Sequence, residues 1–177
     1  FNVIDLSSLS AAWSCCACNT NKEPDSAIMF ESSSSNDKSI LCIEGNIFVN
    51  NQTLEFSAVD YENAVLGFYV RNTSSETIAM RIEVESMSGT DGSLMELCFG
   101  ECYYGVTTGS SYPSNPSSPN VNIEPGQTQV SSGDHFFNSD GGDGINPVEY
   151  TFKFYLADES GNQNGTVFRI KYRYIRN

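Results

Sequence analysis

Hydrophobic and polar residues alternate along most of the chain after Gly45, and a period of two residues is typical of β-strands. The alternation is clearest in TIAMRIEVES (77–86), VEYTFKFYLAD (148–158) and TVFRIKYRYIR (166–176). Shorter alternating runs predict further strands at 40–49, 53–59, 64–71 and 121–124. Since no helical pattern separates these runs, they predict an all-β chain that folds as an antiparallel β-sandwich of about seven to nine strands.

Three stretches depart from this pattern. SSYPSNPSSPN (110–120) is rich in proline and serine, so we expect an exposed loop, and ESSSSNDKS (31–39) is a low-complexity link. A short helix over about 5–15, or an extended arm lying on the sandwich, is indicated by apolar residues at helical spacing: Leu6, Leu9, Trp13 and Cys16. These features divide the chain into an N-terminal cysteine-rich arm with its serine-rich link (1–38) and a sandwich domain (39–177).

The charge of the chain excludes some partners. It carries 22 acidic and 9 basic residues, a formal net charge of −13. Nucleic acids and anionic lipids are bound through positive surfaces, so neither is expected as a partner. No apolar run reaches the length of a membrane span. Few basic residues, many Ser, Thr and Asn, and an even number of cysteines favour an exported protein that is secreted, periplasmic or attached to the cell surface.

The six cysteines are Cys15, Cys16, Cys18, Cys42, Cys98 and Cys102. The last two stand four positions apart in a predicted turn, where Cα atoms approach closely enough for a disulfide. A redox pair would use C-x-x-C at the start of a helix, and a zinc site would need two N-terminal cysteines to converge on this pair. We therefore expect a Cys98–Cys102 disulfide that shapes the turn. We also expect Cys42 to tie the arm to the sandwich by bonding one of the three N-terminal cysteines.

Several short motifs resemble those of an immunoglobulin-like β-sandwich in secreted proteins of Bacteroidetes bacteria. That family carries an N-x-S/T strand end, an F-C-W-G-x-C-Y-P hairpin, an I-x-P-G-x-T turn and a Y-T-F-x-D strand before a final Val- or Ile-rich strand. The corresponding pieces here, in the same order, are VRNTSS (70–75), LCFGECYY (97–104), IEPGQT (123–128), YTFKFYLAD (150–158) and TVFRIKY (166–172). Phe99 stands where Trp is usual, and Tyr104 where Pro is usual. The resemblance implies an immunoglobulin-like fold, export and an accessory role, often beside a sorting or lipid anchor, without an active site.

The residues themselves also argue against an enzyme. His135 is the only histidine, so a Ser-His-Asp or Cys-His arrangement would have to use it. Asp134 is adjacent to it, and adjacent residues of a strand point to opposite faces. We therefore expect a partly exposed loop histidine, no catalytic residues and no organic cofactor.

The segment NSDGGDGIN (138–146) is the candidate for a bound cation. Asp140 and Asp143 could offer carboxylate oxygens to Ca²⁺, and the glycines between them permit a close backbone approach. The Glu that completes an EF-hand loop is missing. The segment therefore predicts either an acidic turn between strands or a weak Ca²⁺ site.

Tyr103, Tyr104 and Tyr112 lie in or near predicted loops. Exposed aromatic rings stack on sugars or contact protein partners, although Tyr103 or Tyr104 could instead pack beneath the disulfide turn. Two functions follow. One is a non-catalytic structural, adhesive or accessory module that contacts a protein through its loops or a sheet edge. The other is a carbohydrate-binding module that uses these tyrosines.

Overall fold

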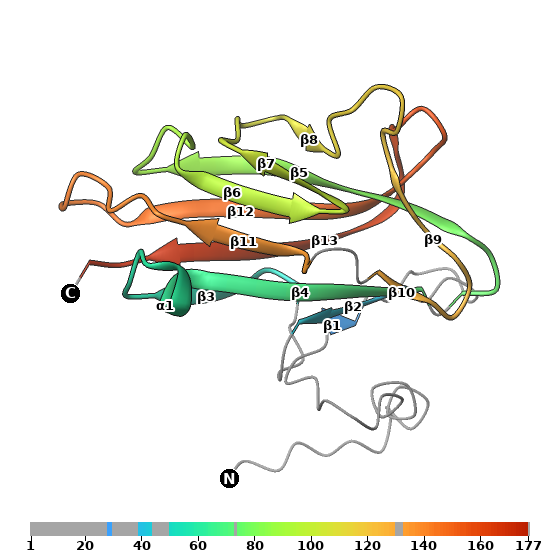
Figure 1. Cartoon of the computed structure of the whole chain (residues 1–177), viewed down its shortest axis with the longest axis horizontal. Coiled ribbons are helices and arrows are strands. Elements are labelled where there is room, and N and C mark those ends of the chain that lie inside the picture. Colours follow the sequence, from blue (N-terminus) through green and yellow to red (C-terminus); the bar gives the residue numbers. More distant parts are fainter. Residues whose placement is uncertain (1–27, 30–38, 44–49, 73, 130–132, 177) are drawn as a thin grey trace, which may run out of the picture.

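The structure is a computed structural model that describes residues 28–29, 39–43, 50–72, 74–129 and 133–176. Two sheets account for most of this part of the chain (Figure 1). The first sheet contains, in spatial order, β1 (Ile28–Met29), β2 (Ser39–Ile43), β4 (Val65–Asn72), β11 (His135–Asn138), β6 (Met95–Phe99) and β7 (Glu101–Tyr104), with β10 (Thr128–Gln129) beside β4. The second contains β3 (Gln52–Phe56), β13 (Gln163–Tyr174), β12 (Val148–Ala157), β5 (Ile78–Ser88) and β8 (Ser111–Tyr112), with β9 (Val121–Ile123) beside β5. One helical turn, α1 (Tyr61–Ala64), precedes β4.

The order of the strands is that of an immunoglobulin domain. Taken along the chain, β2, β4, β5, β6, β11, β12 and β13 correspond to strands A to G. They are arranged in space as A-B-E-D in one sheet and C-F-G in the other. The predicted immunoglobulin-like sandwich is therefore confirmed. The additional strands are short, apart from β3, which pairs with β13 in parallel and so departs from the antiparallel pattern expected.

Aromatic rings fill the space between the sheets. Phe136 of β11 stacks on Phe152 of β12, with ring centroids 3.9 Å apart, and Phe68 of β4 stacks on the other side of the cluster, 4.9 Å from Phe136. The alternation seen in the sequence explains which side chains point inward: on β5, the buried residues are Ile78, Met80, Ile82 and Val84. Burial of such side chains is the main source of stability in a domain of this kind.

The proline- and serine-rich segment is only partly the exposed loop that we expected. Its first residues form β8, and Tyr112 and Pro113 are buried. The guanidinium group of Arg81 holds this segment, because it donates to the carbonyl oxygens of Ser111 at 3.2 Å and Pro113 at 2.8 Å. It also donates to Gly161 O at 3.0 Å, in the turn between β12 and β13. A single side chain therefore links an edge strand to the neighbouring hairpin.

Apart from Ile28–Met29, which form β1, the N-terminal arm and its link (1–38) lie outside the described residues, and so do the predicted helix at about 5–15 and Cys15, Cys16 and Cys18. Cys42 lies on β2, within a predicted strand, and its bond to the arm stays a prediction. In the part of the chain that the structure describes, no helix has the length and apolar character needed to cross a membrane.

Candidate functional site

Three neighbouring strands of the first sheet bring the chemically reactive side chains together. In the register of β11, β6 and β7, His135 lies opposite Cys98, and Cys98 lies opposite Cys102. Two residues along the same strands, Phe137 lies opposite Glu96, and Glu96 opposite Tyr104. Residues two apart on a strand point to the same face of the sheet, so the two rows of side chains share a face. This is the outer face, away from the core.

Cys98 and Cys102 form a disulfide across the β6–β7 hairpin, which confirms the pairing predicted from their spacing. Their Cα atoms are 4.0 Å apart. Cys98 is fully buried, whereas Cys102 is exposed on the edge strand. The ring that this bond closes is so short that its entropic stabilisation is only about 2 kcal/mol, so the bond shapes the hairpin more than it holds the domain together.

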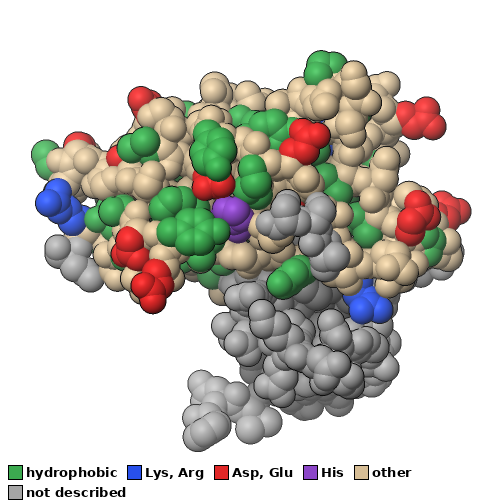
Figure 2. All heavy atoms as spheres, in the orientation of Figure 1, with side chains coloured by type: hydrophobic (Ala, Val, Ile, Leu, Met, Phe, Trp, Pro, Cys, Tyr) green, Lys and Arg blue, Asp and Glu red, His purple; other side chains and the backbone are tan. Residues whose placement is uncertain are grey.

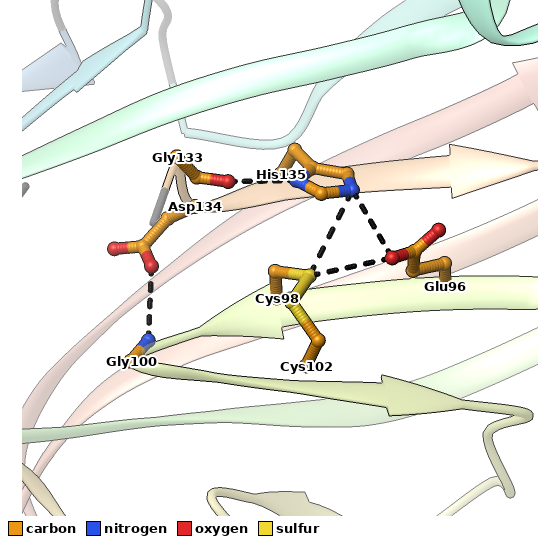
Figure 3. The surroundings of a disulfide bond; sticks show 7 residues. All are labelled: Glu96, Cys98, Gly100, Cys102, Gly133, Asp134 and His135. Carbon is orange, nitrogen blue, oxygen red and sulfur yellow. Dashed lines mark hydrogen bonds and ion pairs between the residues drawn. A yellow bond between two sulfur atoms is a disulfide. The ribbon is translucent and has the colours of Figure 1, made fainter. Parts of the chain in front are cut away.

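His135 is buried on a central strand, so the expectation of a partly exposed loop histidine is wrong. Its Nε2 atom lies 3.7 Å from Cys98 Sγ and 3.7 Å from Glu96 Oε1 (Figure 3). On the other side of the ring, Nδ1 lies 2.7 Å from the carbonyl oxygen of Gly133. A carbonyl oxygen only accepts hydrogen bonds, so Nδ1 carries a proton, and Nε2 is the ring nitrogen that faces the sulfur and the carboxylate.

Asp134 does not take part in this cluster. Its carboxylate points away from the His135 ring and accepts a hydrogen bond from the Gly100 amide at 2.9 Å (Figure 3). Burial raises the pKa of Asp134 to about 7, although the hydrogen bonds from Gly100 and the Gln129 side chain oppose this rise. The contact fixes Gly100, whose φ of 71° belongs to the left-handed region, at the tip of the hairpin. Asp134 therefore supports the turn that brings the two cysteines together.

Aromatic side chains surround the histidine. Tyr61 of α1 contacts the rings of His135 and Phe137 edge-on, with centroids 5.9 and 5.0 Å away, and 56% of Tyr61 is exposed. Tyr104 is 80% exposed, and a hydrogen bond to the Glu96 carboxylate raises its pKa. Figure 2 shows hydrophobic and acidic side chains gathered around the only histidine on this side of the molecule. We call Tyr61, Glu96, Tyr104, His135 and Phe137 the aromatic face.

The three tyrosines singled out in the sequence do not share one surface. Tyr112 is buried, so its expected exposure is wrong, and its ring lies 4.9 Å from that of Tyr103. The hydroxyl of Tyr103 donates to Glu101 at 2.9 Å and accepts from the amide of Ser114 at 3.0 Å. Of the three, only Tyr104 belongs to the aromatic face.

The carboxylates of Asp140 and Asp143 both accept hydrogen bonds from amides of their own turn, and Asp140 also accepts one from the loop that follows β5. Asp140 accepts from Thr90 Oγ1 at 2.6 Å and from the Gly142 amide at 2.8 Å. Asp143 accepts from the amides of Ile145 and Asn146, each at 2.8 Å, and these bonds lower its pKa. Both residues therefore stabilise the acidic turn, and the weak Ca²⁺ site stays a prediction. In the described part of the chain, the side chains that meet as a potential metal-binding group are instead Glu96, Cys98 and His135.

Comparison with known proteins adds one structure. A solved structure described as the N-terminal domain of PorA is similar, with 19% sequence identity, a TM-score of 0.44 and coverage of 77% of this chain and 96% of that chain. A similarity of this size carries no inference about function. No family model matches the chain, and no curated protein is similar to it at a significant level.

Proposed function

We propose that this chain is a non-catalytic, exported β-sandwich module that binds a protein partner through the aromatic face and its edge strand. The observation that carries the proposal is the exposure of two tyrosines on one face, 56% for Tyr61 and 80% for Tyr104. Tyrosine contributes a large contact area at low conformational cost, so it is frequent among the residues that dominate binding energy. The acidic residue Glu96 between them adds a polar group for specificity.

The position of β7 supports binding at this edge. It is the last strand of its sheet among the described residues, and an edge strand offers backbone N–H and C=O groups to another chain. The strand is short and is held to β6 by the disulfide. A rigid edge loses little conformational entropy on binding.

The chemistry of the face supports a binding role over catalysis. Among the described residues, the imidazole of His135 is held between the Gly133 carbonyl, Glu96 and an oxidised cysteine, and none of these three is a free hydroxyl or thiol nucleophile. Asp134 points away from it (Figure 3). The disulfide supports export, since such bonds persist in oxidising compartments.

A glycan is the second candidate ligand. The exposed Tyr104 ring stands beside a carboxylate, and this pairing suits a sugar, whose C–H face stacks on an aromatic ring while its hydroxyls donate to an acid. This version of the carbohydrate-binding hypothesis uses Tyr104 and Tyr61 in place of Tyr103 and Tyr112.

Binding of the labelled, oxidised protein to arrays of extracellular proteins and of glycans tests the proposal. Tyr104→Ala and Tyr61→Ala should each weaken binding about tenfold or more, as expected for central interface residues. Ile145→Ala is the matched control, because Ile145 is 86% exposed but lies outside the aromatic face. Tyrosine-dependent signal on proteins supports the proposal, and the same dependence on glycans selects the second candidate. Equal binding by all three variants and the parent would contradict both.

A further inference from the structure

We propose that Glu96, Cys98, Cys102 and His135 form a Zn²⁺ site when the Cys98–Cys102 disulfide is reduced. This inference is independent of the binding role proposed above. The zinc site considered from the sequence needed two thiols from the N-terminal arm. The structure instead supplies a histidine from the neighbouring strand β11 and a carboxylate from β6, the strand of Cys98 itself.

The spacing of three of the ligand atoms fits a tetrahedral ion. Cys98 Sγ, His135 Nε2 and Glu96 Oε1 form a triangle in which each side measures 3.7 Å. Atoms that bind one tetrahedral Zn²⁺ at about 2.0–2.3 Å lie about 3.3–3.8 Å from one another. The triangle therefore already has nearly the dimensions of one face of such a site. Cys102, the cross-strand neighbour of Cys98, is placed to supply the fourth ligand.

The surroundings of His135 prepare its ring for a metal. The proton on Nδ1 is directed at Gly133 O, 2.7 Å away, so Nε2 is the nitrogen that faces Cys98 and Glu96 and would bind the ion (Figure 3). In metal sites, the second ring nitrogen of a histidine ligand commonly donates to a carbonyl or a carboxylate in this way, which fixes the tautomer and the ring orientation. The ring is also held by the edge contact with Tyr61.

Reduction changes the donor atoms of the site. A low-molecular-weight dithiol attacks the exposed Cys102 sulfur as a thiolate, and Cys98 leaves as a thiolate. The second thiol of the reagent then displaces Cys102 from the mixed disulfide. Two electrons have passed to the protein, the reagent has become a cyclic disulfide, and two cysteines are free. Binding of Zn²⁺ keeps both as thiolates and releases their protons to water.

The donor set selects the ion. Two thiolates and an imidazole are ligands of Zn²⁺ and are poor ligands of Ca²⁺ or Mg²⁺, which prefer oxygen alone. With two thiolates and one carboxylate, the occupied site would carry a net charge of −1. In the oxidised protein the sulfurs are neutral and bonded to each other, so the site should hold the ion only after reduction.

The test uses the chain of 177 residues with the other four cysteines replaced by serine, C15S/C16S/C18S/C42S, so that only Cys98 and Cys102 remain as thiols. The protein is reduced with a phosphine, freed of reagent without oxygen, and titrated with Co²⁺ as a spectroscopic probe and with Zn²⁺. We expect one equivalent to bind, with cobalt–thiolate charge-transfer absorption and the intense visible bands of a tetrahedral centre. The oxidised sample should show neither.

A nitrogen-15 spectrum of the single histidine identifies the ligand atom directly, because every imidazole signal belongs to His135. Zn²⁺ should shift the Nε2 resonance of the reduced protein and leave the proton on Nδ1. His135→Ala should weaken Co²⁺ binding at least about tenfold. Removing a residue that only hydrogen-bonds to a metal ligand already costs about this much, and His135 is expected to be a ligand itself.

Glu96→Gln keeps the size of the side chain and therefore tests the site even if His135→Ala fails to fold. Glu96→Gln should also weaken Co²⁺ binding. Glu101 lies between the two cysteines in the sequence and bonds Tyr103, so Glu101→Gln should bind Co²⁺ as the parent does. The proposal is overturned if the reduced protein binds no Co²⁺, if Nε2 does not shift with Zn²⁺, or if Glu101→Gln weakens binding as much as Glu96→Gln.

Discussion

Phe136 and Phe152 stack almost in parallel across the two sheets, with ring centroids 3.9 Å apart and planes 8° apart. Phe136 belongs to β11, the same strand that presents His135 on the opposite face. The core and the candidate site are therefore two faces of one strand. A change on the core side moves the backbone that positions the histidine, whereas a change on the outer side leaves the core intact.

Phe136→Ala should destabilise the protein by about 3–5 kcal/mol, because it removes a fully buried ring and leaves a cavity between the sheets. Phe137→Ala, one residue away on the outer face, is the matched control and should cost about 1 kcal/mol. Urea unfolding followed by circular dichroism measures both. Equal losses for the two variants would mean that the rings between the sheets do not dominate the core.

Asn72→Asp should destabilise the protein by about 2–4 kcal/mol. Asn72 is fully buried, and its amide donates to Glu76 O at 2.7 Å and Ile123 O at 2.8 Å, while its oxygen accepts from the amide of Ser74 at 2.9 Å. An aspartate cannot donate to either carbonyl, so the buried hydrogen bond to Ile123 O is lost, whereas Glu76 O keeps the donor that Ser74 Oγ provides. Asn164→Asp is the control, because Asn164 is exposed, and it should change the unfolding free energy by less than about 0.5 kcal/mol.

The burial of Asn72 also bears on glycosylation. Asn72 begins an Asn-x-Ser triplet, and its amide nitrogen donates to two backbone carbonyl oxygens, so this side chain has a structural role in the folded protein. We expect mass spectrometry of protein expressed with a glycosylating host to find Asn72 unmodified. A glycan at Asn72 on folded protein would contradict the burial described here.

Arg81→Lys should loosen two separate loops although it keeps the charge. The guanidinium reaches three carbonyl oxygens, those of Ser111, Pro113 and Gly161, and a lysine ammonium cannot match this planar fork of donors. The free energy of unfolding should fall by about 1–3 kcal/mol. Hydrogen exchange should rise in both 110–114 and 158–162. Faster exchange in only one of the segments would show that Arg81 does not link them.

The strands with clean alternation could be predicted from the sequence, and so could the disulfide. In β5, β12 and β13 one face is buried and the other is polar, so local pattern and tertiary environment agree. The spacing of Cys98 and Cys102 is also local, and a turn of that length leaves few alternatives. These features depend on residues close together in the sequence.

The candidate site could not be predicted in the same way, because it depends on the pairing of distant strands. His135 meets Cys98 only through the β6–β11 register, across 37 positions of sequence. The run His135-Phe136-Phe137 has apolar rings on both faces, so its alternation is hidden. Tyr61 was missed because it lies on a single helical turn. One signal was present in the sequence. Glu96 and Cys98 lie two residues apart on one predicted strand and therefore share a face, which indicates a polar neighbour for the cysteine.

The stability of the protein should fall steeply in strong alkali, and Tyr150 is one identifiable cause. Burial raises the pKa of Tyr150 to about 12, since the phenolate would be poorly solvated between the sheets. The hydroxyl donates to Asn138 Oδ1 at 3.1 Å and also lies 3.2 Å from Thr90 Oγ1. In the unfolded chain the pKa is about 10, so the folded state holds this proton more tightly. The stabilisation is complete below about pH 10 and is lost as the pH rises through about 12.

Tyr150→Phe should therefore have opposite effects at the two ends of the pH range. Near pH 8 the substitution should lower the unfolding free energy by about 1 kcal/mol, because the side-chain oxygen of Asn138 loses a hydrogen-bond donor. Between about pH 10 and 12 the unfolding free energy of Tyr150→Phe should decline less steeply than that of the parent, because one buried phenol no longer ionises. The difference between the two declines should reach up to about 3 kcal/mol over this interval. Unfolding in urea at a series of pH values measures both curves, which should converge and then cross in strong alkali. Tyr172, whose pKa burial also raises, remains in both proteins, but only in the parent does the charge of the Tyr150 phenolate add to that rise. Curves that stay parallel up to pH 12 would show that the Tyr150 phenol ionises as easily in the folded protein as in the unfolded chain.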